Sequence, residues 1–204
     1  MTKLYAGLAV GAVAALLGWT GYSIYSARPD DQFAQCRGGA VAGGDIGGAF
    51  TLVDETGATV TDRQVITKPT LVYFGYTFCP DVCPLDNARN AEAVDLLKER
   101  GIDVTPVFIS IDPERDTADV MRDYTDNMHP GMVGMTGSVE QVKAASAAYR
   151  TYYKKQESGD EYYLMDHSTF TYLVFPVTGF ADFFRRETTP AEMAERVACF
   201  AKAR

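Results

Sequence analysis

The sequence has few cysteines, few histidines and no excess of positive charge, and these shortages exclude several classes of protein. Four cysteines among 204 residues are too few for a small domain built on disulfides. Lysine and arginine total 19 against 27 aspartates and glutamates, and the resulting net charge of -8 argues against a nucleic-acid-binding surface. Apolar residues make up 47% of the chain, which is enough for a packed core and too high for a disordered chain. We therefore expect one globular domain with an appendage.

The appendage is predicted at the N-terminus, where residues 4–27 contain no charged side chain. This run exceeds the roughly 20 residues that a membrane-spanning helix needs. Trp19 and two tyrosines lie near its C-terminal end, and such rings favour the membrane interface. A cleaved signal peptide is the alternative, but the residues before Arg28 do not form a convincing cleavage site. The sequence therefore predicts an uncleaved, single-pass transmembrane helix over residues 1–27.

The rest of the chain is predicted to be a linker followed by the domain. Residues 28–47 are rich in glycine and show little periodicity, which indicates a linker. The domain then covers residues 48–204. Lys3 precedes the apolar run, so the positive-inside rule favours a domain on the far side of the membrane. We expect an inner-membrane protein whose domain lies in the bacterial periplasm.

Hydrophobic periodicity in the domain predicts alternating strands and helices. Alternating residues on both sides of Gly57 predict an N-terminal β-hairpin, with the glycine at a positive φ. Buried strands are predicted at 71–75, 104–111 and 169–175, a short strand at 180–184, and helices at 84–100, 116–127, 138–149 and 190–202. This order fits an α/β fold with a central mixed sheet and helices on both faces.

Two cysteines follow the predicted strand at 71–75 in the sequence Cys79-Pro80-Asp81-Val82-Cys83-Pro84. They are expected in a strand-to-helix turn, at the edge of the sheet where α/β proteins bind ligands. The amides of the helix N-terminus favour thiolates there, and the two prolines stiffen the turn. Thiolates select soft ions such as copper(I) or zinc. The alternative is a Cys79–Cys83 disulfide, either structural or redox-active.

A metal at two thiolates needs another ligand, and the chain contains two histidines. His167 precedes the predicted strand at 169–175, and the loop entering that strand is expected beside the cysteine turn. His129 lies in a polar loop and is expected to be remote. Two cysteines and one histidine suit three-coordinate copper(I), whereas zinc prefers a fourth ligand. The plainer alternative makes His167 a hydrogen-bonded loop residue and Asp81 a turn residue.

Three stretches of the chain, in this order, resemble the Sco/SenC family. They are residues 71–84 (LVYFGYTFCPDVCP), 107–117 (VFISIDPERDT) and 166–169 (DHST). The resemblance covers residues 47–203 and implies a thioredoxin-like fold. It also implies one copper ion, as copper(I) or copper(II), bound by Cys79, Cys83 and His167. Asp81 matches an acidic residue of the family motif, which implies a role in copper transfer or partner contact.

The family resemblance implies a metallochaperone that helps assemble the CuA centre of cytochrome c oxidase subunit II. Other copper chaperones are further expected partners. The alternative function is a thiol-disulfide oxidoreductase that reduces the CuA-site cysteines of the partner. Cys79 and Cys83 would form its redox dithiol, with Cys79 as the nucleophile. A thioredoxin-like peroxidase would need supporting residues such as glutamine and tryptophan around its reactive cysteine. The single tryptophan, Trp19, lies in the predicted anchor, so this function is disfavoured.

The chain departs from the family pattern at a few positions. Phe78 stands where many relatives carry a polar residue or histidine, which is expected to change the solvation of the site. Cys36 and Cys199 lie outside the pattern. In an oxidising compartment they are expected either to form a disulfide or to remain two unrelated thiols.

Overall fold

The computed structural model describes residues 2–26, 33, 35–37, 46–157 and 162–203. The chain divides into two compact units, Met1–Gln35 and Cys36–Arg204. The first unit contains helix α1 (Thr2–Ser26). Within the described part of the chain, no helix combines the length and the apolar character that a membrane crossing requires. Most of the predicted linker lies outside the described residues.

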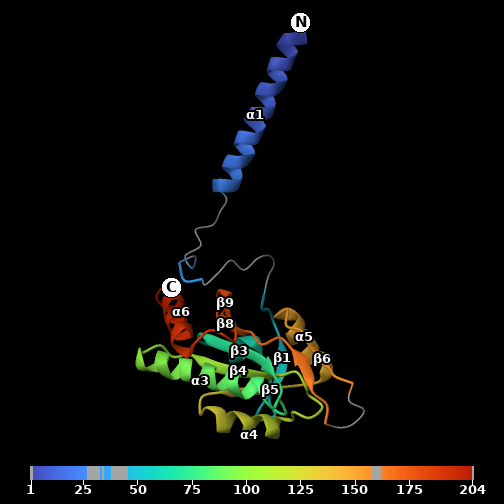
Figure 1. The fold of residues 1–204 in the computed structure, drawn as a ribbon, viewed down its shortest axis with the longest axis vertical. Coiled ribbons are helices and arrows are strands. Elements are labelled where there is room, and N and C mark those ends of the chain that lie inside the picture. The colour runs from blue at the N-terminus through green and yellow to red at the C-terminus, as the bar shows by residue number, and fades with distance from the viewer. Residues whose placement is uncertain (1, 27–32, 34, 38–45, 158–161, 204) are drawn as a thin grey trace. The chain divides into compact units, whose positions relative to one another are not determined.

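The second unit is built around a seven-stranded mixed sheet with the strand order β2-β1-β5-β4-β3-β8-β9 (Figure 1). β3, β4 and β5 run parallel, while β1, β2, β8 and β9 pair with their neighbours in antiparallel fashion. The strands are β1 (Thr51–Asp54), β2 (Thr59–Thr61), β3 (Thr70–Gly75), β4 (Thr105–Ser110), β5 (Val133–Thr136), β8 (Thr171–Phe175) and β9 (Gly179–Phe184). The predicted thioredoxin-like α/β fold is therefore confirmed.

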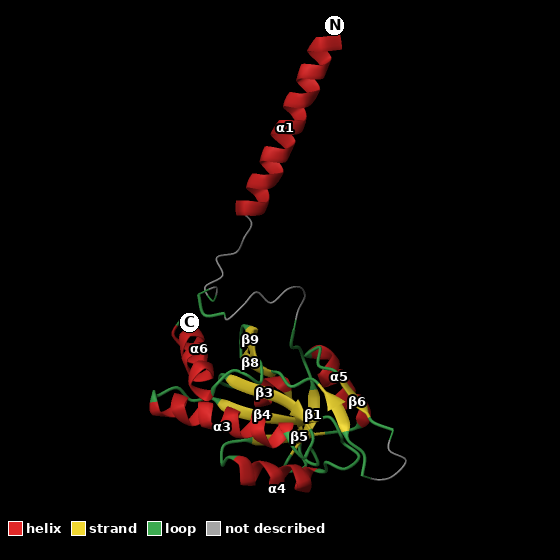
Figure 2. Cartoon of the chain, viewed as in Figure 1, coloured by secondary structure: helices red, strands yellow, loops and turns green. Residues whose placement is uncertain are grey.

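The helices cover both faces of this sheet, and a second, two-stranded sheet lies outside it (Figure 2). The helices are α2 (Asp62–Val65), α3 (Val82–Glu99), α4 (Ala118–Met128), α5 (Val139–Ala148) and α6 (Pro190–Lys202). The small sheet pairs β6 (Tyr153–Lys155) with β7 (Met165–His167) in antiparallel fashion. The closing helix α6 begins with a capping box, in which Thr189 and Glu192 bond each other's backbone amides.

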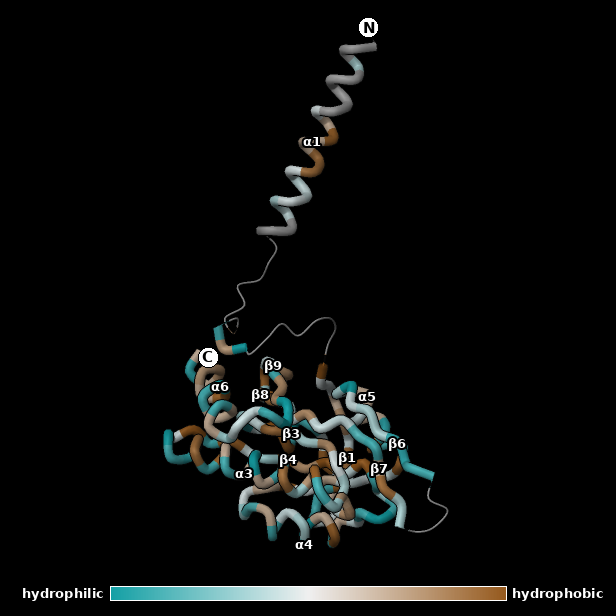
Figure 3. The backbone as a smooth tube through the Cα atoms, in the orientation of Figure 1, coloured by the Kyte–Doolittle hydropathy of each residue, from teal (hydrophilic) through white to brown (hydrophobic). Residues whose placement is uncertain are grey.

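Alternation along β3 places its side chains on two different helical layers. Tyr73 points toward α3 and α4: its ring lies 6.2 Å from that of Phe108, which packs 4.9 Å from Tyr124 of α4. Phe74 points the other way and packs 5.3 Å from Tyr149, at the end of α5. All six residues of β3 are buried, as expected of a strand covered on both faces. Figure 3 shows hydrophobic segments along the central strands.

The predicted hairpin is confirmed, with Gly57 at φ 85°. The structure also contains strands β5, β6 and β7, which the sequence-based expectation did not include. The helices expected in succession are separated by β5, where Gly134 donates its amide to the Glu55 carboxylate at 2.7 Å. A Cβ at Gly134 would lie 3.1 Å from Met121 of α4, so glycine lets this strand pass close beneath the helix. His167, expected in a loop, is the last residue of β7.

A disulfide joins Cys36 to Cys199 of α6, with 5.5 Å between their Cα atoms. Of the two alternatives for these cysteines, the structure shows the pair. The bond closes a loop of 163 residues. A disulfide that closes such a loop stabilises a fold mainly by restricting the unfolded chain, typically by about 2–4 kcal/mol. The disulfide thereby ties the first residue of the second unit to its closing helix.

Candidate metal centre

Cys79 and Cys83 lie where β3 gives way to α3, in the predicted strand-to-helix turn. Cys79 belongs to the turn and is 8% exposed, whereas Cys83 occupies the first turn of α3 and is fully buried. The Cys83 amide donates to the Cys79 sulfur at 3.3 Å. An amide of the helix N-terminus, which has no partner within the helix, therefore faces the Cys79 sulfur, and this arrangement favours a thiolate.

His167 reaches the same point from β7. Its Nε2 lies 3.4 Å from the Cys83 sulfur, and the ligand atoms of Cys79, Cys83 and His167 all lie within 4.8 Å of one another. The other ring nitrogen, Nδ1, lies 2.8 Å from the carbonyl oxygen of Ser168. A carbonyl oxygen only accepts, so Nδ1 carries the proton in this bond and the Nε2 lone pair faces the sulfurs.

The imidazole of His167 is also fixed by two aromatic neighbours. Tyr73 and Tyr76 meet it edge to face, with ring centroids 6.3 and 5.8 Å away. Both tyrosines come from β3 or the residue that follows it, so the cysteine turn and the histidine share the same aromatic surroundings. The structure thus brings together the three residues that the sequence singled out as metal ligands.

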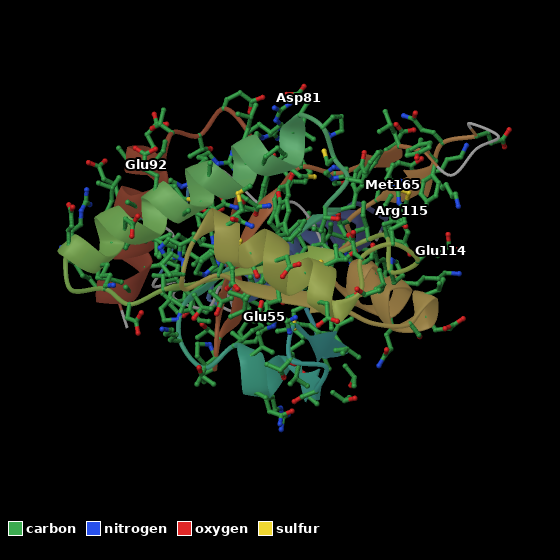
Figure 4. All side chains as sticks on the ribbon, turned by 90° about the horizontal axis from the view of Figure 1, so that it is seen from below. Glu55, Asp81, Glu92, Glu114, Arg115 and Met165 are labelled. Atoms are coloured by element: carbon green, nitrogen blue, oxygen red, sulfur yellow. A yellow bond between two sulfur atoms is a disulfide. The ribbon has the colours of Figure 1, made fainter. Side chains whose placement is uncertain are left out.

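The other candidate residues lie elsewhere. His129 bonds Asp95 at 3.3 Å and accepts from the Gly131 amide at 3.0 Å, away from the sulfurs. Asp81 is exposed at the beginning of α3, where its side chain makes no capping hydrogen bond (Figure 4). An exposed carboxylate beside the metal-binding turn can contact a partner. Its predicted role in transfer stays a prediction.

The two thiols differ in acidity because they are bonded to each other. The hydrogen bond from the Cys83 thiol is the largest cause that lowers the pKa of Cys79, to about 3; backbone bonds add to it, although burial opposes the shift. The same bond to Cys79, followed by burial, raises the pKa of Cys83. The pair therefore holds one proton, on Cys83, and presents Cys79 as the thiolate.

The alkylation rate of Cys79 is expected to be nearly constant from about pH 5 to pH 8. A thiol reacts as its thiolate, and Cys79 stays ionised at every pH above its lowered pKa. An ordinary cysteine, with a pKa of about 8.5, loses reactivity roughly tenfold per pH unit below that value. Mass-spectrometric rates with iodoacetamide on the metal-free protein test this, and a tenfold rise per pH unit would contradict the assignment of Cys79 as the thiolate.

The donor set fits a soft metal ion. Two thiolates and one imidazole suit copper(I), which accepts three ligands, whereas zinc sites usually take four. Cys79 and Cys83 are free thiols in this structure, so the predicted Cys79–Cys83 disulfide is not formed here. That disulfide remains a prediction for the oxidised state. It is the chemical alternative to a bound metal, because the same two sulfurs would be used.

Sequence reasoning missed the buried polar groups that support the site. Asp116 is fully buried and accepts from the Thr77 amide at 3.1 Å, the Thr77 hydroxyl at 2.6 Å and the Ser110 hydroxyl at 2.6 Å. Burial raises the pKa of Asp116. Its bonds fix the turn two residues before Cys79. Asp116 belongs to a stretch that the family resemblance had already marked, which was the available signal.

Beneath Cys83, a buried tyrosine and carboxylate form a second support. The Tyr73 hydroxyl donates to Asp86 at 3.0 Å, and Asp86 lies 3.5 Å from Arg89 and 3.6 Å from Arg186. Burial raises the pKa of Asp86, the larger effect, while the two arginines act against it. The only sign of this network in the sequence is weak: several polar residues of α3 occupy the face of the helix that turns inward.

Comparison with known proteins agrees with this geometry. A family model described as SCO1/SenC matches residues 39–202. The chain belongs to the SCO1/SenC family. Protein SenC of Rhodobacter capsulatus, a member by name, is 54% identical over 200 residues, covering 98% of this chain and 90% of SenC.

Two solved SCO1/SenC relatives contain the metal that the donor set suggests. Arabidopsis thaliana ScoI with copper bound is 40% identical, with a TM-score of 0.72 over 77% of this chain and 99% of ScoI. Yeast Sco1 with copper bound is 32% identical, with a TM-score of 0.73 over 79% of this chain and 91% of Sco1. The family resemblance stated from sequence is therefore confirmed.

Proposed function

We propose that this SCO1/SenC protein binds one copper ion through Cys79, Cys83 and His167 and delivers it to the CuA site of cytochrome c oxidase subunit II. The convergence of the three ligand atoms within 4.8 Å carries the proposal. Two relatives solved with copper bound support the choice of metal. The family resemblance supports the receiving partner, and copper is the cargo of this protein.

The burial of the ligands suits a cargo that is held and then released. Cys83 is fully buried, Cys79 is slightly exposed and His167 is partly exposed. An incoming thiolate can therefore replace the more accessible ligands first while Cys83 retains the ion. Such stepwise ligand exchange moves copper between proteins without free copper in solution. Exposed Asp81, at the start of α3, is placed to meet the partner during the exchange.

Dithiol chemistry is the second candidate, favoured by the low pKa of Cys79 beside a protonated Cys83. The Cys79 thiolate would attack a disulfide of the partner and release one partner thiolate. Cys83, losing its proton, would then attack Cys79 in the mixed disulfide and release the second thiolate. The products are a Cys79–Cys83 disulfide and a reduced partner, so two electrons pass from this chain to its partner.

We also propose that the N-terminal segment anchors the protein in the inner membrane, with the domain in the periplasm. The uncharged run over residues 4–27 and the resemblance to Sco/SenC proteins support this. A Cys36–Cys199 disulfide is consistent with an oxidising compartment. Membrane attachment would place the copper site near a membrane-bound oxidase.

A transfer assay with the full-length, reduced protein tests the proposed function. The protein should bind one equivalent of copper, and mixing it with the metal-free soluble domain of subunit II should produce the CuA absorption. Free copper chelated at the same concentration serves as the control. If the protein binds copper but the CuA absorption forms only when chelated copper is the metal source and this chain is added without metal as a reductant, the dithiol function replaces copper delivery.

A further inference from the structure

His167 lies on a part of the domain that the central sheet does not hold. In the described structure β6 and β7 pair with each other and not with the seven-stranded sheet, whereas both cysteines follow the central strand β3. The separation of His167 from the sulfurs therefore depends on what fastens β7 to the cysteine turn. One fastening is the Met165 amide, which donates to the Tyr76 hydroxyl at 3.2 Å.

Arg115 supplies a second connection between these two parts. Its guanidinium carbon lies 3.7 Å from the ring centroid of Tyr163 and 4.8 Å from that of Phe78. Phe78 directly precedes Cys79, and Tyr163 lies in the segment that enters β7. A guanidinium is attracted to the face of an aromatic ring, and more strongly where water is excluded. Figure 4 labels Arg115 and Met165 at the same end of the domain.

Tyr163 is held from several directions. Its side chain is buried, and its hydroxyl donates to Asp112 at 2.7 Å. Arg115 donates from Nε to the other oxygen of the same carboxylate at 2.5 Å. Lys155 of β6 lies 3.6 Å from the Tyr163 ring and pairs with Glu114 at 3.1 Å. These contacts join the loop after β4 to β6 and to the segment that enters β7.

From these contacts we propose that Arg115 and Tyr163 form a latch that holds His167 against the two sulfurs. The Arg115–Tyr163 latch is a set of positioning residues and touches neither sulfur nor imidazole. With the latch closed, the third copper ligand is held in place. With it open, β7 moves away while the cysteines stay where they are. The inference deepens the proposed copper function by naming what controls one ligand of that site.

The cysteine turn has its own support, which makes the proposed effect selective. Asp116 accepts two hydrogen bonds from Thr77 and one from Ser110, and the Cys83 amide donates to the Cys79 sulfur. None of these bonds involves the latch. Loss of the latch is therefore expected to loosen the histidine side and spare the thiol side.

Hydrogen exchange of the metal-free, full-length protein tests the latch directly. Arg115→Met and Tyr163→Leu are expected to raise the exchange rate of the amides in β7 and at Ser168 about tenfold, with unchanged exchange in β3 and β4. Arg115→Lys should behave like Arg115→Met, because an ammonium cannot reproduce the planar stacking. Arg122→Met is the matched control, since Arg122 is a surface arginine of α4 paired with Asp119 at 2.6 Å.

Copper(II) affinity of the same variants provides the second measurement, with an expected loss of about tenfold. Unchanged exchange in β7, or an equal rise across β3, β4 and β7, would overturn the latch in favour of general packing. Tyr163→Phe keeps the ring under Arg115 and loses only the hydroxyl bond to Asp112, so it should raise exchange in β7 less than Tyr163→Leu does, and it guards against misfolding of Tyr163→Leu. If wild-type protein bound no copper, the proposed function would fail, yet the exchange data would still decide the latch.

Discussion

Replacing His167 with alanine is expected to abolish the copper(II)–thiolate absorption of the loaded protein. The structure offers one imidazole at the two sulfurs, with Nε2 3.4 Å from Cys83. Removing it leaves two thiolates, too few for stable copper(II). The loss in copper(II) affinity should exceed the roughly 10- to 100-fold that the loss of a mere supporting contact costs at a metal site. Optical titration of the reduced, full-length protein measures both quantities.

His129→Ala is the matched control for this experiment. His129 is the other histidine of the chain, and its bonds to Asp95 and Gly131 lie away from the sulfurs. The His129→Ala protein should bind copper like the wild type. If His167→Ala instead retained the wild-type absorption and affinity, the three-ligand site would be wrong, and Cys79 and Cys83 would have to act with some other group or as a dithiol alone.

The same variant separates the two candidate functions. Attack on a disulfide needs the Cys79 thiolate and Cys83, and the pKa of Cys79 is lowered first of all by its bond to Cys83. His167→Ala should therefore keep reductant activity while losing copper. A protein that supports CuA assembly with this substitution would act as the reductant, whereas one that fails would act through copper.

Local sequence signals were sufficient for the cysteine half of the site. A continuous apolar run predicts β3, the prolines around the cysteines predict a stiff turn, and apolar residues at helical spacing predict α3. These features depend on neighbours in the chain. The approach of His167 was inferred from the order of the strands, and the structure places its Nε2 beside Cys83. Its location on a strand was not foreseen.

The missed strands carry no apolar pattern of their own. β6 reads Tyr-Lys-Lys and β7 reads Met-Asp-His, so each is recognisable only by pairing with the other across the chain. β5 contains Gly134, which lowers the strand propensity of a four-residue segment. In each case the stabilising contacts are long-range, and periodicity within a short window cannot detect them.

The sequence pattern of α3 is misleading for a different reason, because several of its polar residues are buried. Periodicity assigns polar residues to the solvated face, yet Asp86, Asn87, Arg89 and Asn90 are all buried. They bond to residues far along the chain: Asp86 to Tyr73, and both Arg89 and Asn90 to Thr171. Such a network can be found only when the strands and the helix are placed together. Its position beneath Cys83 makes it part of the site's support.

Gly75→Ala is expected to weaken copper binding although it replaces none of the three ligands. A Cβ at Gly75 would lie 2.8 Å from the Cys83 sulfur, 2.8 Å from the Phe108 ring and 3.0 Å from the Tyr73 ring. All three groups are buried, so the sulfur has to move or the strand has to shift. We expect overpacking to lower the free energy of unfolding by about 1–3 kcal/mol. Copper affinity should fall about 10- to 100-fold, as when a supporting contact of a metal ligand is lost.

Gly134→Ala separates the copper effect of this substitution from its effect on stability. Gly134 is also a buried strand glycine, and its Cβ would meet Met121 at 3.1 Å, but it lies in β5 and outside the metal centre. Denaturant unfolding should show a loss of stability in both variants, whereas the copper titration should show weaker binding in Gly75→Ala alone. Equal copper affinity in the two variants would mean that Cys83 can bind the ion from a displaced position, and that the close packing of its sulfur against Gly75 does not set the geometry of the site.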